Sequence, residues 1–186
     1  MTRADTPAEG PGGDSVITDI EDVSAMALSS EELADLVGVG GLCVFSWTTR
    51  DGHPMGVLVA YVFRAGRFWT TAPAQRKRLS ALYVRPGSSI VVTSNATTAT
   101  FKGESIIHGP SEPGWNTLKD WFYAAMSGTA HDPGNSRALT MHRLLDSPHR
   151  VIIETPVQPV VSFDWAKFEV ALGAAIGTTN TARQPA

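Results

Sequence analysis

The residues of this sequence best suited to chemistry are three consecutive cations, Arg76, Lys77 and Arg78. The spacing of apolar residues behind them predicts a helix that ends near Pro86. Cations at the start of a helix add their charge to free backbone N–H groups and to the positive end of the helix dipole. This basic triplet therefore indicates a site for a phosphate group or another small anion.

The triplet lies in a stretch from Gly52 to Gly103 that contains no Asp or Glu, although the chain has a formal net charge of −3. The cations of this stretch are Arg64, Arg67, Arg76, Lys77, Arg78, Arg85 and Lys102. Nucleic acid would favour a basic face over the whole domain, so one basic segment favours a phosphate or carboxylate on a small ligand. The alternative is that these cations are surface charges paired with acids from elsewhere in the fold.

No independent set of catalytic residues accompanies the triplet. The five histidines form no His-x-x-x-His pair, and no serine lies in a Gly-x-Ser-x-Gly elbow. Cys43, the only cysteine, lies in an apolar run and is expected to be a buried, inert thiol. We therefore expect no metal site, and redox chemistry would depend on a cofactor that supplies its own reactive atoms.

Short strands are predicted on both sides of the triplet, because β-branched and aromatic residues alternate with turn signals. The predicted strands are 42–48, 55–63, 68–71, 88–93 and 99–108. A tight Asp-Gly turn follows the first strand, and a second tight turn follows the next. A last strand over 151–154 and 160–163 is predicted to be interrupted at Pro156 and Pro159, which suits a sheet edge or a bulge.

Helices are predicted before, between and after these strands. Ser29 and Glu32 form the capping box of the first helix, and the triplet opens the second. One apolar face through Trp115 and Phe122, followed by a helix over 136–145, predicts a two-helix insertion. Short antiparallel strands with one crossover helix predict a mainly β (α+β) fold, a barrel of about six antiparallel strands.

One domain is expected over residues 23–170, between a disordered tail at 1–22 and a flexible tail at 171–186. Signals of regular structure are weak from Gly173 onward. No apolar run reaches about 18 residues, and the first 15 residues contain no apolar core of a secretory signal. We therefore expect a cytoplasmic protein without a membrane partner.

Three segments occur in the order and at the spacing of one known family. They are the strand end Phe68-Trp69-Thr70-Thr71, the helix start and its continuation over 75–86, and the late strand over 150–165. Together they resemble the pyridoxamine 5′-phosphate oxidase-like, FMN-binding split-barrel family, which includes F420-dependent members. The first segment resembles the family's aromatic-Thr strand end, the second its Ser-Arg-Lys helix start, and the third its closing strand. The resemblance covers roughly residues 30–168.

This resemblance implies a cofactor, FMN or alternatively F420, whose phosphate is held by two residues of the triplet. Counting forward from Thr70 selects Arg76 and Lys77, whereas counting back from the proline that ends the helix selects Lys77 and Arg78. The resemblance also places Val57, Thr70 and Thr71 at the isoalloxazine ring.

The implied activity is that of a flavin-dependent oxidoreductase that transfers a hydride to or from a small organic substrate. The implied assembly is a homodimer with the cofactor at the interface between two barrels. An F420-dependent reductase is the first alternative, in which Arg64, Arg67 and Arg85 would meet the acidic cofactor tail. A non-catalytic flavin- or haem-binding protein is the second, and no nucleic-acid partner is expected.

Overall fold

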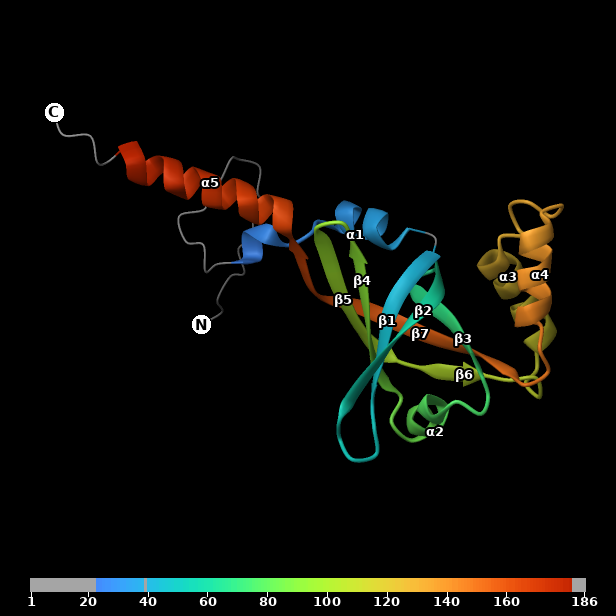
Figure 1. The fold of residues 1–186 in the computed structure, drawn as a ribbon. Coiled ribbons are helices and arrows are strands. Elements are labelled where there is room, and N and C mark those ends of the chain that lie inside the picture. The colour runs from blue at the N-terminus through green and yellow to red at the C-terminus, as the bar shows by residue number, and fades with distance from the viewer. Residues whose placement is uncertain (1–22, 39, 182–186) are drawn as a thin grey trace, which may run out of the picture.

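Six strands of the computed structural model, which describes residues 23–38 and 40–181, close into an antiparallel barrel (Figure 1). They are β1 (Gly40–Thr48), β2 (Pro54–Arg64), β3 (Arg67–Pro73), β4 (Gly87–Ser94), β5 (Thr97–Glu104) and β7 (Arg150–Asp164). The strand order is β3-β2-β1-β4-β5-β7, and β7 pairs back to β3. The short strand β6 (Ile106–His108) adds to β7. The predicted mainly β barrel is thus confirmed, whereas the predicted tail at 1–22 lies outside the described residues.

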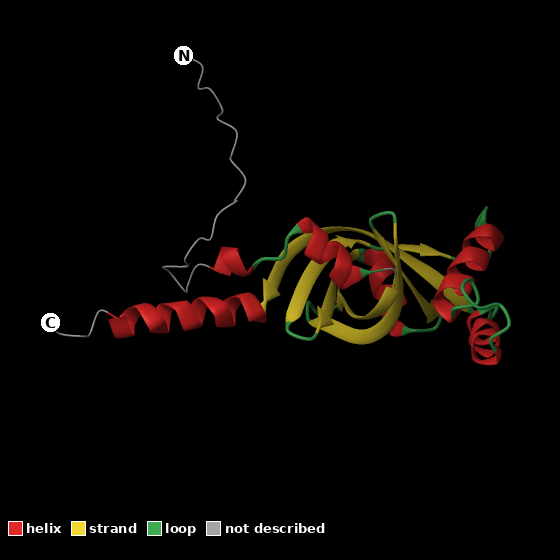
Figure 2. Cartoon of the chain, turned by 90° about the horizontal axis from the view of Figure 1, so that it is seen from above, coloured by secondary structure: helices red, strands yellow, loops and turns green. Residues whose placement is uncertain are grey.

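The described residues also form five α-helices and one 3-10 helix. They are the 3-10 helix η1 (Val23–Met26), α1 (Ser30–Val37), α2 (Lys77–Val84), α3 (Trp115–Ser127), α4 (Ser136–Leu145) and α5 (Trp165–Thr181). Helix α2 closes one end of the barrel, where Leu79 and Leu82 join the core. Helices α3 and α4 lie together outside the barrel on one side, and α5 extends away from the barrel on the opposite side (Figure 2). The predicted crossover helix and two-helix insertion are both present. No helix in the described part of the chain is long and apolar enough to span a membrane.

Aromatic rings fill the centre of the barrel. The Phe68 ring lies 4.9 Å from the rings of Tyr61 and Phe63 and 5.2 Å from that of Phe101, measured between centroids. Cys43 is 2% exposed in the same core, and burial raises the pKa of its thiol to about 12. The thiol stays protonated near neutral pH, as expected for an inert core residue.

Two predicted strand boundaries are wrong. Residues 99–108 form two strands rather than one, because the chain breaks at Ser105, whose buried hydroxyl bridges the hydroxyls of Ser88 and Thr155. Conversely, β7 is one continuous strand despite its prolines. Pro156 is paired with the first residue of β3 and so lies at the end of that ladder. Pro159 lies beside a register shift against β5. Ladder ends and bulges are the positions in a sheet that tolerate proline.

The C-terminal helix extends further than the sequence signals indicate. Helix α5 runs through Thr181, although the pattern of regular structure weakens from Gly173. Lys167 anchors its first turns, because its ammonium group donates to the Glu32 carboxylate at 2.8 Å and to the Ala27 carbonyl at 3.0 Å. Residues 171–181 are therefore helical, while the division of the chain into a domain and a flexible tail stays a prediction.

Candidate functional site

The basic triplet forms the start of α2, as its pattern predicts. After β3 the chain turns back, and the Arg76 N–H donates to the Pro73 carbonyl at 3.1 Å. Arg76 is the N-cap residue with extended backbone, Lys77 is the first helical residue, and no side chain caps the helix. The first turn therefore keeps free backbone N–H groups beside two exposed cations, an arrangement that suits an anion.

Arg78 is the partly buried member of the triplet. Its guanidinium Nη2 donates to the Thr71 carbonyl at 3.4 Å, and its Nε is buried without a hydrogen-bond partner. Burial, and secondly the charge of Arg76, lower the pKa of Arg78. Within the described chain, no carboxylate lies within ion-pair distance of Arg76, Lys77 or Arg78. The triplet therefore carries positive charge without an ion-pair partner and includes a buried donor.

Next to the triplet, the ladder between β2 and β3 opens. Strand β2 pairs with β1 from Pro54 to Val62, but it pairs with β3 only from Val62 to Arg64. On its other edge β3 pairs with β7 along its whole length, from Arg67 to Pro73. Within the described residues, the edge of β2 before Val62 thus has no strand partner on the β3 side. Its N–H and C=O groups remain available for a polar planar ligand.

The predicted ring-binding residues lie on both sides of this opening. Val57 belongs to the stretch of β2 that has no partner in β3, and on its other edge it is paired with Phe45 of β1. Thr70 is 2% exposed inside the barrel, and the hydroxyl of Thr71 donates to the Val151 carbonyl at 2.7 Å. Of these three residues, Thr71 contacts the triplet, because its carbonyl accepts from the Arg78 guanidinium. Contacts of these threonines to a ring would therefore use backbone groups, and their role stays a prediction.

A cavity of about 610 Å³ borders the triplet, and the sequence analysis did not find it. It lies between the β1–β2 hairpin and α2, where Trp47 and Met55 face Lys77 and Val84. Its two walls are about thirty positions apart in the sequence and join only when the hairpin folds over the helix. No local pattern could have revealed it, and its volume falls in the range of small-molecule and cofactor sites.

A second charged cluster was also missed. The Glu154 carboxylate is buried on β7 and accepts from Arg67 and from Nε2 of His108, at 2.7 Å for the histidine. Nδ1 of His108 lies 2.9 Å from Glu112, and the Trp69 ring stacks on the imidazole. One cation of the acid-free stretch is thus paired with an acid from elsewhere in the fold, as the alternative interpretation expects, but the triplet is not.

Comparisons with known proteins show which solved structures have a similar fold. No protein-family model and no curated protein sequence matches this chain. Among solved structures, it is similar to the conserved hypothetical protein Rv2991 from Mycobacterium tuberculosis, with TM-score 0.61 and 18% identity over 78% of this chain and 91% of the other.

Two further structures have related folds. An FAD-binding protein from Mesorhizobium loti has TM-score 0.51 and 15% identity, with 73% of this chain and 94% of the other covered. The haem storage protein HutZ from Vibrio cholerae has TM-score 0.52 and 9% identity, with coverage of 73% and 96%. At such identities the similarity concerns the fold alone. We conclude that this chain has the split-barrel fold that its sequence resembles.

Proposed function

We propose that this protein is a flavin-dependent oxidoreductase that binds FMN at the start of α2 and along the open edge of β2. The observation that carries this proposal is the basic triplet, because its three cations have no carboxylate partner among the described residues. Cations beside free helix N–H groups favour an anionic ligand, because both supply donors and positive charge at one point.

The residues present fit a phosphomonoester. Its oxygens would accept from the first-turn N–H groups of α2 and would meet the charges of Arg76 and Lys77. The buried Nε of Arg78 is a donor without a partner, which an oxygen at this point would satisfy. The adjoining cavity of about 610 Å³ supplies space of the size that a cofactor ring system occupies.

Bound FMN would supply the atom that accepts or donates the hydride, so the chain's own task is to bind and orient. In this proposal the triplet fixes the phosphate end, and the open backbone edge around Val57 orients the ring. Trp47 and Met55 line the adjoining cavity with apolar surface and reduce its water content. A small organic substrate would be the partner in hydride transfer.

We further propose that the active form is a homodimer. The outer face of β1 and β2 carries large apolar side chains, with Leu42 59%, Val44 39% and Leu58 67% exposed. Strand register places Val44 directly opposite Leu58, so these residues form one continuous patch. A second barrel on this patch would remove it from water and enclose the cofactor between two copies. Sedimentation at micromolar concentration should give twice the 19.8 kDa chain mass; a monomer would exclude this assembly.

The test of the phosphate site compares FMN with riboflavin, which lacks the phosphate. Replacing Arg76 and Lys77 together by Ala should weaken FMN binding by about 3–6 kcal/mol, a factor of about 100 or more, because two charge-assisted contacts are lost. Riboflavin should lose far less. If the double variant binds FMN as tightly as the parent, the proposal fails.

Two controls sharpen this experiment. The matched control removes two exposed arginines of α4, Arg137 and Arg143, and should leave FMN affinity unchanged. Arg78→Ala decides which pair of the triplet holds the phosphate: a larger effect than that of Arg76→Ala would select Lys77 and Arg78.

An F420-dependent reductase on the same fold is the second candidate, favoured by one further cation beside the site. Arg85 lines the cavity next to Lys77 and would meet an acidic cofactor tail, although Asp51 lies in the same lining. Arg64 lines a different groove, and Arg67 is paired with Glu154. The visible absorption spectrum of the purified protein separates flavin, F420 and haem, because each cofactor has its own bands. A haem spectrum would instead indicate the non-catalytic alternative.

A further inference from the structure

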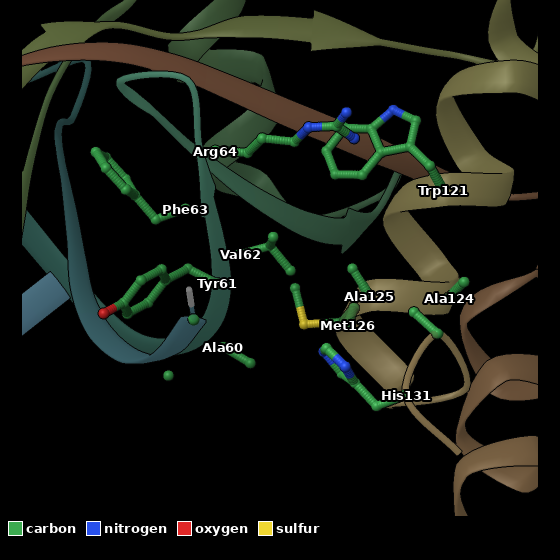
Figure 3. A pocket seen from close by; sticks show the side chains of 13 residues that line it. Ala60, Tyr61, Val62, Phe63, Arg64, Trp121, Ala124, Ala125, Met126 and His131 are labelled. Carbon is green, nitrogen blue, oxygen red and sulfur yellow. The ribbon is translucent and has the colours of Figure 1, made fainter. Parts of the chain in front are cut away.

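A second groove lies between the end of β2 and the C-terminal half of α3 (Figure 3). Its volume is about 690 Å³, and it includes no residue of the basic triplet or of the cavity beside Lys77. Its walls are mostly apolar, with Val62 on the strand side and Ala125 and Met126 on the helix side. A groove of this size and polarity is typical of small-molecule sites.

Arg64 supplies the charge of this groove. Among its described lining residues, Arg64 is the only arginine or lysine, and none is Asp or Glu. The guanidinium carbon lies 4.9 Å from the centroid of the Trp121 ring, within the range of a cation–π contact (Figure 3). The Trp121 ring itself packs perpendicular to the Trp69 ring, with 5.1 Å between the two centroids. The cation is therefore held in place without a counter-charge.

This geometry leaves the hydrogen-bonding capacity of Arg64 free. The contact with Trp121 uses the charge of the guanidinium group and none of its five N–H donors, and the Arg64 side chain makes no hydrogen bond to another described residue. Within the described chain, no carboxylate lies within ion-pair distance of Arg64. An oriented cation at one end of an apolar groove selects a ligand with an anion at one end and an apolar body.

We propose that this groove binds a small apolar molecule that carries one anionic group. The anion lies on the free edge of Arg64, and the apolar body contacts Met126, Ala125 and Val62. This site is separate from the proposed flavin site, so it stands or falls independently of FMN binding.

The test uses two fluorescent probes of similar size, anionic 1-anilinonaphthalene-8-sulfonate and neutral N-phenyl-1-naphthylamine. In Arg64→Met the affinity for the anionic probe should fall by about tenfold or more, because a charge-assisted contact is lost. The affinity for the neutral probe should change by less than about twofold, since methionine retains the apolar wall. Arg143→Met, an exposed arginine on α4, is the matched control and should change neither probe.

A further variant places the probes in this groove. Ala130 is an exposed residue of its lining, so Phe at this position has room to enter the groove without disturbing the core. Ala130→Phe should weaken both probes, and an unchanged melting temperature verifies folding. Unchanged binding of the anionic probe in Arg64→Met, or equal losses of both probes in that variant, would overturn the proposal. Unaltered binding of both probes in Ala130→Phe would also overturn it.

Discussion

On the outer face of β3 and β7, Arg67 meets the buried carboxylate of Glu154, whereas at the start of α2 the basic triplet meets no carboxylate among the described residues. Arg67 and the triplet come from the same acid-free stretch of sequence. Glu154 lies 87 positions from Arg67 in the chain and becomes its neighbour only because β7 closes the barrel against β3.

This difference separates charges that the fold itself compensates from charges left for a ligand. Glu154 also accepts from His108, which in turn contacts Glu112, so that cluster is satisfied within the protein. The triplet instead keeps the unpartnered Nε of Arg78. Removing a partner should therefore destabilise the first region, whereas removing cations should affect binding but not folding in the second.

The largest stability effect is expected at Glu154. Glu154→Ala removes a carboxylate that is 5% exposed and leaves Arg67 and His108 without their shared acceptor. We expect a loss of about 2–4 kcal/mol in the free energy of unfolding, measured by urea denaturation.

The control is the exposed end of the same cluster. Glu112→Ala removes a carboxylate whose side chain is 43% exposed and should cost about 1 kcal/mol or less. Equal stability of Glu154→Ala and the parent protein would mean that the Arg67 contact does not stabilise the fold. The Glu154 cluster would then not differ from the triplet in its effect on stability.

An intermediate effect is expected where α1 meets α5. The Lys167 ammonium group, and then the Ser29 N–H, hold the pKa of Glu32 below its ordinary value. A lowered folded-state pKa stabilises the protein above the unfolded-state pKa, and this stabilisation is lost as pH falls through the folded-state value. Between pH 6 and pH 3 the parent should therefore lose about 1 kcal/mol or less more than Glu32→Gln. Parallel pH profiles of the two proteins would contradict this assignment.

The smallest stability effect is expected at the triplet. Replacing Arg76 and Lys77 by Ala should change the free energy of unfolding by about 0.5 kcal/mol or less, because both side chains are exposed and have no ion-pair partner in the described chain. Sulfate, at an ionic strength matched with chloride, should raise the melting temperature of the parent more than that of this variant, since an anion that binds the folded state stabilises it. A large loss of stability in the variant would mean that these cations are structural.

Short-range features of this fold were determined by the sequence alone. The capping box is present, with the Ser29 hydroxyl accepting from the Glu32 N–H at 3.2 Å. The Asp-Gly turn between β1 and β2 uses Gly52 at φ 86°, a conformation that glycine adopts without strain. The start of α2 at the basic triplet follows the same logic. Each depends on residues a few positions apart, so local backbone preference and local hydrogen bonds decide it.

Only the tertiary structure decided which distant segments meet. The closure of β3 on β7 gives Arg67 its acid and keeps β7 continuous through Pro156. The short ladder between β2 and β3 leaves the edge of β2 open beside Val57. The groove at Arg64 likewise requires α3 to lie against the outer face of β2. Such contacts depend on strand register and on packing between segments far apart in the chain. Composition and periodicity specify which face of an element is apolar, but they do not specify which other element covers it.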